Sequence, residues 1–189
     1  MSRAMICVMN INLVDSPISR NDGYTFLATQ TSQVHVWRFS LVQRVDVISR
    51  LFATLSEDEI ARVSQLRFPE HKNKSIVARG VMRTILGEYL GMSASKLNFC
   101  YGEAGKPALR FPAQSTLEFN LSHSHEEGVL ALTYGRRLGI DIEYVNEASE
   151  HDGLVDRFFP PPKPGCLNES TRIEGMMLFF IPGYRKKRT

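Results

Sequence analysis

The sequence predicts an α+β fold, in which helices pack against antiparallel strands. Residues 117–121 and 138–145 alternate apolar and polar side chains, and this period of two is typical of half-buried strands. Apolar side chains also recur at helical spacing and indicate one long helix: Ala78, Met82, Ile85 and Tyr89. With 189 residues, 43% hydrophobic and 23% charged, the chain can bury a core of its own.

The first elements follow from local patterns. Residues 34–41 are rich in β-branched and aromatic side chains and predict a strand, with Trp37 in the core. Ser56 and Glu59 have the spacing of a capping box, which predicts a short helix that runs to Leu66. The long helix is predicted to begin after Pro69 and to stop at Gly91, because glycine often follows the last helical turn.

Strands dominate the next part of the chain. Residues 97–101 predict a strand, and residues 102–109 predict a turn, because two glycines free the backbone and a proline stiffens the exit. Residues 117–121, 129–134 and 138–145 then follow with short turns between them. We interpret these last three stretches as an antiparallel meander.

Composition excludes several classes of protein. The formal net charge of +3 is too small to indicate nucleic-acid binding by itself. The chain has three widely spaced cysteines, Cys7, Cys100 and Cys166, and no CxxC pair. This pattern argues for a reducing compartment and against a zinc site. No apolar run approaches the ~18 residues of a membrane span. We therefore expect a cytoplasmic protein that contacts no membrane.

Asp141 and Glu143 are the candidate metal ligands. On a strand, residues two apart point to the same side and lie about 6.6 Å apart, so both carboxylates project from one face while Ile140 and Ile142 anchor the other. Two such carboxylates suit a hard cation such as Mg²⁺. The alternative is an ordinary polar sheet face, which this stretch alone leaves open.

Basic side chains could face an anionic ligand. Arg79 and Arg83 stand four residues apart on the predicted long helix and therefore share a face. Such a pair is commonly a solvated surface; the upstream Lys72 and Lys74 make this end of the helix a fit for phosphate instead. Lys106 lies between glycine and proline in the predicted turn, where its ammonium would point outward, although exposed turn lysines are common.

Ser122 and His123 follow directly after the strand at residues 117–121. In the predicted meander they come to one strand end, near the carboxylates of Asp141 and Glu143. The alternative for His123 is a loop histidine that hydrogen-bonds to the backbone.

These features stand in one order: a basic helix, then G-K-P-A-L, F-N-L-S-H-S and L-G-I-D-I-E. As an ordered set, they resemble the 4′-phosphopantetheinyl transferases of the surfactin-synthetase type, over about residues 34–159. The resemblance implies two similar α/β halves with a coenzyme between them. The first half would be complete at residues 33–135, and residues 136–159 would begin the second with the metal-binding strand.

The resemblance also implies an activity. Such enzymes transfer the phosphopantetheine arm of coenzyme A to a serine of an acyl or peptidyl carrier protein, with Mg²⁺ bridging the pyrophosphate. Asp141 and Glu143 would be the catalytic metal ligands. Five further residues would hold the coenzyme: Arg79, Arg83, Lys106, Ser122 and His123. We expect a monomer whose partners are the coenzyme and the carrier protein, not nucleic acid.

The resemblance stops after Phe159. The family has a helix with W-x-x-K-E here, whose glutamate is a third metal ligand, whereas residues 160–165 are proline-rich and the remainder to 189 shows no periodicity. One permitted set of codons for residues 176–189 spells D-A-F-F-Y-T-W-V-Q-K-E-A-Y in another frame. Our hypothesis is therefore a truncated second half, with a frameshifted, irregular tail at residues 160–189.

Two alternatives follow from this tail. Without the third metal ligand, transfer would be impaired, and the chain could be an inactive remnant that still binds coenzyme A or a carrier protein. The last residues, 184–189, contain four consecutive cations, so a nucleic-acid binder is a further alternative, and a solvated tail is the preferred interpretation of that run. Residues 1–32 show no sustained periodicity and form an unplaced N-terminal arm in this scheme.

Overall fold

The computed structural model describes residues 34–102, 106–111, 115–135, 137–144, 169–173 and 176–182. The predicted N-terminal arm, the proline-rich run at 160–165 and the basic run at 184–189 lie outside the described residues. So do Cys7 and Cys166, whereas Cys100 is a free, exposed thiol.

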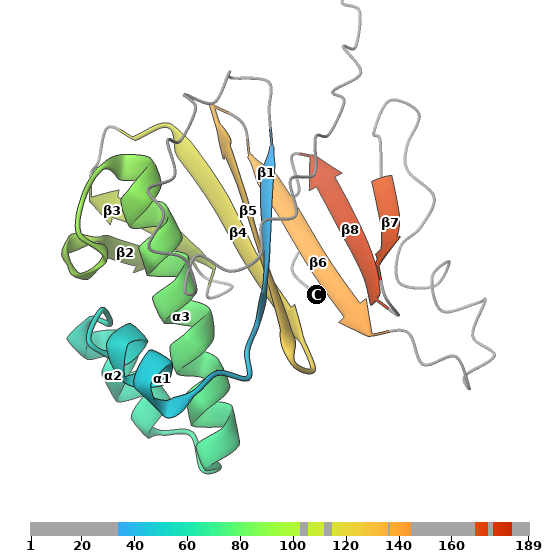
Figure 1. Ribbon diagram of the computed structural model, residues 1–189. Helices are drawn as coiled ribbons and strands as arrows, with labels where there is room; N and C mark the ends of the chain where they lie inside the picture. Colours follow the sequence, from blue (N-terminus) through green and yellow to red (C-terminus); the bar gives the residue numbers. More distant parts are fainter. Residues whose placement is uncertain are drawn as a thin grey trace, which may run out of the picture.

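Helices follow the first strand, and the remaining strands come after them (Figure 1). The first group comprises β1 (His35–Ser40), α1 (Val45–Phe52), α2 (Glu57–Ser64), α3 (Pro69–Leu90) and the short 3-10 helix η1 (Ala94–Lys96). The second comprises β2 (Asn98–Tyr101), β3 (Pro107–Phe111), β4 (Leu117–Ser124), β5 (Glu127–Tyr134), β6 (Leu138–Tyr144), β7 (Glu169–Ile173) and β8 (Met176–Pro182). The predicted mixture of helices and strands is confirmed.

The long predicted helix is confirmed as α3. Pro69 occupies its first turn, where the missing N–H costs nothing, and Gly91 follows its last residue in the left-handed conformation at φ 62°. The capping box is also present, because the Ser56 N–H donates to Glu59 Oε2 at 3.1 Å. Helix α2 ends at Ser64, two residues before the predicted end.

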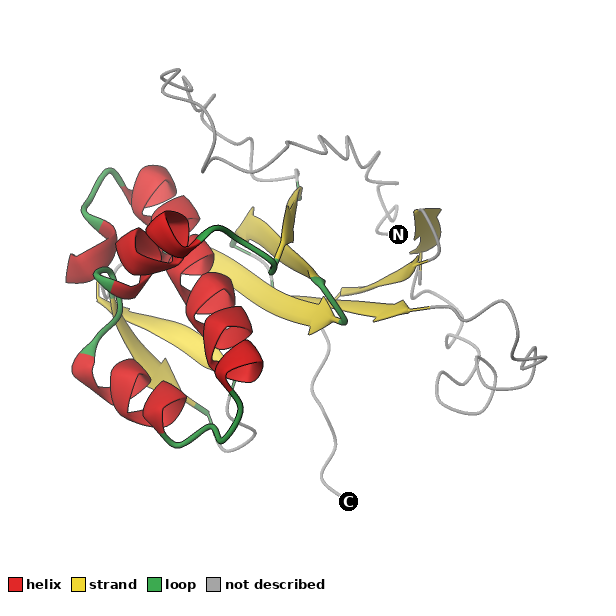
Figure 2. Cartoon of the chain, turned by 60° about the horizontal axis from the view of Figure 1, so that its bottom comes forward, coloured by secondary structure: helices red, strands yellow, loops and turns green. Residues whose placement is uncertain are grey.

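The helices cover one face of the sheet formed by β1, β5 and β4 (Figure 2). All neighbours in this sheet are antiparallel, and β5 is central. Its face toward the helices contributes Leu130 and Leu132 to the main core, beside Trp37 and Phe39 of β1. Trp37 is therefore a core residue, as predicted.

Strand β6 packs on the opposite face of that sheet. Three of its side chains, Leu138, Ile140 and Ile142, form a second apolar cluster with Val129 and Ala131 of β5 and with Val34 and Val36 at β1. Strand β5 is thus buried on both faces, which explains why residues 129–134 form a nearly continuous apolar run and not an alternation.

The strands differ from the prediction in three places. Strand β6 pairs with β8, in a sheet of order β6-β8-β7, so the predicted meander ends at β5. Residues 169–173 and 176–182, which the sequence predicts to be irregular, form β7 and β8. Strand β8 pairs with β6, and β7 pairs with β8, so backbone pairing supplies what their side-chain pattern does not show. Strand β3 begins at Pro107, inside the predicted turn, and β4 extends through Ser122 and His123.

Among the described helices, none is both long and apolar enough to cross a bilayer.

A close contact between β1 and β5 gives a stability prediction. A Cβ added to Gly128 would lie 2.6 Å from the ring of Phe39, which is buried and cannot move aside. We expect Gly128→Ala to lower the free energy of unfolding by about 1–3 kcal/mol, as overpacking does. Gly102→Ala is the control, because its Cβ would meet nothing nearer than 3.9 Å. Urea denaturation measures both; an equal effect at the two sites would contradict this packing.

Candidate functional site

The two acidic residues of β6 share one face of the strand, as predicted. Ile140 and Ile142 are 7% and 2% exposed and point into the second apolar cluster. Asp141 is partly exposed and Glu143 is exposed. The apolar side chains thus fix β6 on the sheet while both carboxylates face away from that core.

Ser122 of β4 holds the carboxylate of Asp141. Its Oγ donates to Asp141 Oδ1 at 2.6 Å, and the N–H of Ile142 donates to the same carboxylate oxygen at 3.1 Å. The Ile142 N–H also donates to Ser122 Oγ at 3.4 Å, so this N–H is shared between the two acceptors. Asp141 is therefore oriented by two donors on its Oδ1.

The edge of β6 opposite β8 is bound by side chains. The N–H of Ile140 donates to Asn120 Oδ1 at 2.8 Å, two residues before the contact of Ile142 with Ser122. Lys106 Nζ donates to the carbonyl oxygen of Leu138 at 3.0 Å. Alternate residues of an antiparallel strand turn their N–H and C=O to the same side. Lys106, Asn120 and Ser122 therefore satisfy one continuous edge of β6, which we call the β6 edge.

Lys106 is anchored to this edge through its ammonium group. Burial against the strand lowers the pKa of Lys106, Glu118 opposes that shift, and Arg137 adds to it.

His123 lies on the other side of β4. Side chains alternate along a strand, so His123 shares the face of Leu117 and Phe119, which pack into the core beneath the helices, while Ser122 faces β6. Its ring is exposed at the end of the strand. The structure thus brings Ser122 and Lys106 to β6, and it places His123 across the strand from them.

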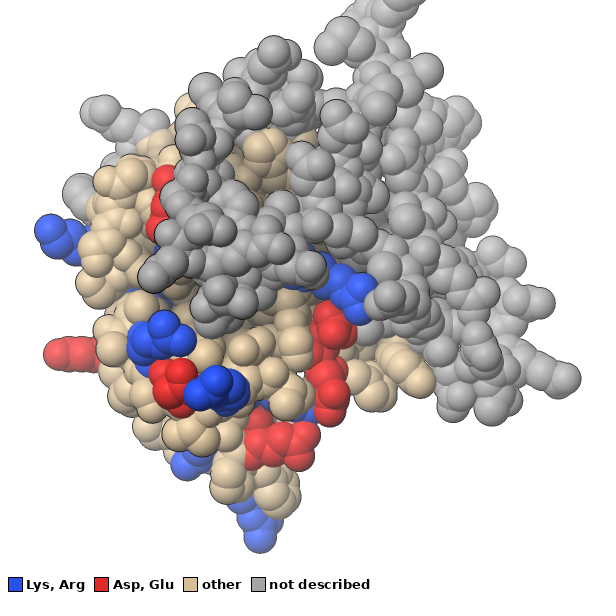
Figure 3. Space-filling view, viewed as in Figure 1, with Lys and Arg blue, Asp and Glu red and all other residues tan. Residues whose placement is uncertain are grey.

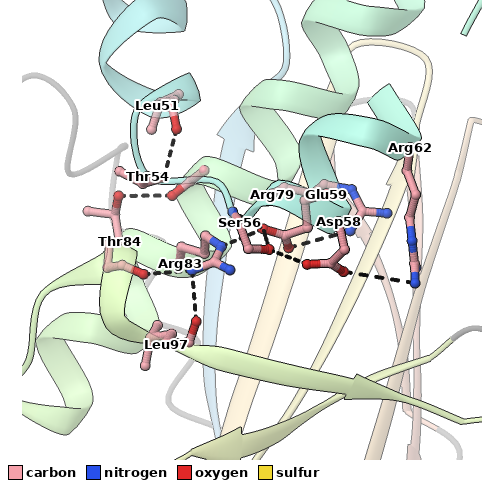
Figure 4. Close-up of polar contacts among 12 residues, drawn as sticks. Leu51, Thr54, Ser56, Asp58, Glu59, Arg62, Arg79, Arg83, Thr84 and Leu97 are labelled. Atoms are coloured by element: carbon pink, nitrogen blue, oxygen red, sulfur yellow. Dashed lines mark hydrogen bonds and ion pairs between the residues drawn. The ribbon is translucent and has the colours of Figure 1, made fainter. Parts of the chain in front are cut away.

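Arg79 and Arg83 share a face of α3, as their spacing predicts, and both contact Glu59 of α2 (Figure 4). Arg83 Nε lies 2.6 Å from Glu59 Oε2, and Arg79 Nη1 lies 3.5 Å from Glu59 Oε1. Tyr101 of β2 donates to Glu59 Oε1 at 3.4 Å; burial and the Glu59 charge raise the pKa of that tyrosine. One carboxylate therefore joins α2, α3 and β2.

The two arginines differ in exposure. Arg83 and Glu59 are 0% exposed, and the Arg83 Nη1 also donates to the carbonyl oxygens of Ala94 and Leu97. The Arg79 side chain keeps 25% exposure. The structure places Arg83 in the interior of the helical layer, whereas Arg79 is partly exposed at its surface and donates to Tyr101 of β2 at 3.2 Å.

Two residues have roles that the sequence patterns do not show. Glu59 is recognisable as a helix cap, but a capping box does not indicate that the same carboxylate also receives arginines from another helix. Asn120 lies within the F-N-L-S-H-S segment, and its alternation with Ser122 is the one local sign that both side chains face one way.

The turn between β4 and β5 lies beside the end of β6. The rings of His125 and Tyr144 are in contact, with centroids 4.4 Å apart and planes tilted by 36°. Glu126 occupies the same turn, and Glu127, the first residue of β5, pairs with Arg38 at 2.9 Å. Figure 3 shows acidic side chains gathered in this part of the molecule, with basic side chains directly above them.

Within the described ranges, no three His, Cys, Asp or Glu side chains come together as a complete metal site. The available donors are the oxygens of Asp141 and Glu143, which suit Mg²⁺, since this ion commonly keeps several waters and takes only one or two protein carboxylates beside phosphate oxygens.

The part of the chain from α1 to the end of β5 is similar to one known protein family. Residues 42–134 match the family described as 4′-phosphopantetheinyl transferase, N-terminal.

Individual relatives carry the same description. The chain is 40% identical over 156 residues to the 4′-phosphopantetheinyl transferase HetI of Nostoc sp., across 82% of this chain and 65% of that protein. It is 33% identical over 110 residues to a phosphopantetheinyl transferase of Thraustochytrium sp., across 58% of this chain and 38% of that protein. These similarities support the 4′-phosphopantetheinyl transferase family for this chain, which spans less than two thirds of either relative.

The buried ion pair gives a second stability prediction. Glu59→Gln removes the negative charge and leaves Arg83 buried without its counter-ion, so we expect a loss of about 3–5 kcal/mol in the free energy of unfolding. Asp46→Asn is the control, because it breaks only exposed ion pairs with Arg44 and Arg50 and should cost no more than about 1 kcal/mol. Denaturant unfolding that shows similar losses for both variants would contradict a structural role for Glu59.

Proposed function

We propose that this chain transfers the 4′-phosphopantetheine arm of coenzyme A to a serine of an acyl or peptidyl carrier protein, with Mg²⁺ as cofactor. The observation that carries the proposal is the β6 edge, where Ser122 orients Asp141 and Lys106 is fixed to the same strand. The similarity to named phosphopantetheinyl transferases supports the same reaction. Within that family, the motifs favour the surfactin-synthetase type.

Asp141 and Glu143 would hold the Mg²⁺. Bound there beside the pyrophosphate of coenzyme A, the ion would supply charge neutralisation for the departing phosphate. The chain's own side chains would do the rest by binding and orientation. Lys106 and Arg79 would bind phosphate oxygens, and His123 would contact the coenzyme from the far side of β4.

The chain needs no nucleophile of its own, since the attacking hydroxyl belongs to the carrier protein. The serine oxygen would form a bond to the phosphorus of the phosphopantetheine arm, and adenosine 3′,5′-bisphosphate would leave. The task left to these residues is to place the diphosphate and to stabilise negative charge on it as the bond to the leaving group breaks. Fixed cationic groups do this well, because they need no rearrangement at the moment of reaction. Ser122 contributes through Asp141, whose carboxylate it orients.

A second candidate function is binding without transfer. The chain's single tryptophan is Trp37, so its sequence contains no W-x-x-K-E segment to supply a third carboxylate. Under this alternative, the chain holds coenzyme A or a carrier protein and transfer is impaired.

One experiment separates the two functions. The chain is incubated with coenzyme A, Mg²⁺ and an apo carrier protein, and the carrier is weighed by intact mass spectrometry. Transfer predicts a carrier heavier by one phosphopantetheine and no gain after chelation of the metal. Calorimetric binding of coenzyme A without any mass gain would favour the second function and contradict the first.

Asp141→Asn tests the metal ligand. Asp141→Asn keeps the size of the side chain and an oxygen for Ser122, but it removes the charge that holds Mg²⁺. We expect transfer to fall by more than about 10–100-fold, the usual cost of disturbing only a supporting contact of a metal site. Glu88→Gln is the control, since Glu88 is an exposed carboxylate on α3, whereas β6 packs on the face of the sheet opposite the helices. Equal transfer rates for wild type and Asp141→Asn would refute the metal site.

The next prediction concerns the lysine at the β6 edge. Lys106→Ala removes a charged hydrogen-bond donor, worth about 1.5–3 kcal/mol, so coenzyme A should bind roughly 10-fold or more weakly. Affinity for the carrier protein should change little. Isothermal titration calorimetry measures both, with Lys96→Ala on η1 as the matched control. A larger loss of carrier binding than of coenzyme binding would contradict the role given to Lys106.

A further inference from the structure

We propose that Asn120 is a positioning residue for the metal-binding carboxylates of β6, and that it acts through the backbone of that strand. The inference rests on the proposed function, because it concerns the same site. Asn120 Oδ1 accepts a hydrogen bond from the N–H of Ile140 at 2.8 Å. Ile140 directly precedes Asp141 in the chain.

The topology explains why a side chain must do this. Among the described strands, β6 has a backbone partner on one side only: β8, whose register pairs Phe180 with Ile140 and Leu178 with Ile142. On the other side lies β4, the outer strand of its own sheet, whose order is β1-β5-β4. The described residues of β4 and β6 form no backbone ladder with each other, so an N–H of β6 that faces β4 is left for a side chain or water to satisfy.

Asn120 and Ser122 meet that need in register. They stand two apart on β4, so their side chains leave the same face, and they receive the N–H groups of Ile140 and Ile142, which also stand two apart. Both pairs run in the same order along the chain, so β6 runs alongside β4 in the same direction. A slip by one residue would break both contacts and turn Asp141 and Glu143 toward the apolar cluster.

The two contacts differ in length, and this identifies the stronger one. The bond to Asn120 is 2.8 Å, whereas the approach of Ile142 N–H to Ser122 Oγ is 3.4 Å, and Ser122 directs its own proton to Asp141 at 2.6 Å. Asn120 therefore fixes the strand, and Ser122 orients the carboxylate on the strand once it is fixed. Asn120 needs no contact with metal, coenzyme or carrier protein to influence all of them.

The test replaces the acceptor while keeping the volume. Asn120→Leu has nearly the same shape and no acceptor, and Asn120→Asp keeps an oxygen at the same position. Asn120→Ser, whose hydroxyl falls short of the Ile140 N–H, replaces the leucine variant if that variant does not fold. Ser124→Ala is the matched control, because Ser124 lies on the same face of β4 and its hydroxyl lies 3.4 Å from the ring of His125, outside the β6 edge.

Two quantities are measured on the full chain: the affinity for Mn²⁺ in the presence of coenzyme A, by electron paramagnetic resonance, and the hydrogen exchange of the Ile140 amide, by NMR. We expect Asn120→Leu to weaken Mn²⁺ binding by about 10-fold or more, as loss of a contact that supports a metal ligand does. Its Ile140 amide should exchange faster. Asn120→Asp should keep the slow exchange and bind Mn²⁺ at least as tightly as wild type.

The outcomes separate the role of Asn120 from the function beneath it. If wild type binds no Mn²⁺ with coenzyme A, both the proposed function and the role of Asn120 are overturned. If wild type binds and Asn120→Leu binds equally well, only the role of Asn120 is overturned. That role is also overturned if Asn120→Asp loses as much affinity as Asn120→Leu, or if affinity falls while exchange at Ile140 stays at the wild-type rate.

Discussion

The β6 edge is the constraint on which the candidate site depends. A strand that presents unpaired N–H and C=O groups must find partners for them or remain solvated. Here Lys106, Asn120 and Ser122 provide those partners from β4 and from the residue that precedes β3. The contacts that complete the hydrogen bonds of β6 also fix the face from which Asp141 and Glu143 project. The same side chains therefore hold the strand in place and set the geometry of the candidate site.

A second polar contact organises the helical layer. Glu59 is fully buried and joins its own helix cap to Arg79, Arg83 and Tyr101. Buried ion pairs contribute little net stability against an apolar replacement, but they fix partners strongly, because a lone buried charge is costly. The Glu59–Arg83 pair therefore fixes the placement of α2 relative to α3. The same carboxylate also holds the partly exposed guanidinium of Arg79.

Much of the candidate site could be predicted from local patterns. The alternation in residues 138–144 identifies which side chains are buried and which are not, because a strand has a period of two. The spacing of Arg79 and Arg83 likewise predicts a shared helix face. Periodicity indicates which face of an element a side chain occupies, but it does not indicate which residue the side chain contacts there. The burial of Arg83, the contact between Asn120 and Ile140, and the pairing of β6 with β8 all depend on residues distant in sequence, so no local pattern could show them.

The proposed site requires a cation between the carboxylates of β6, beside a diphosphate that reaches Lys106. A crystal of the chain grown with coenzyme A and Mn²⁺ tests this placement by anomalous scattering. We expect one Mn²⁺ at about 2.1–2.2 Å from oxygens of Asp141 and Glu143, close to the octahedral distances of Mg²⁺, with the diphosphate on the side of Lys106. Mn²⁺ bound elsewhere, or a diphosphate held away from β6, would contradict the site.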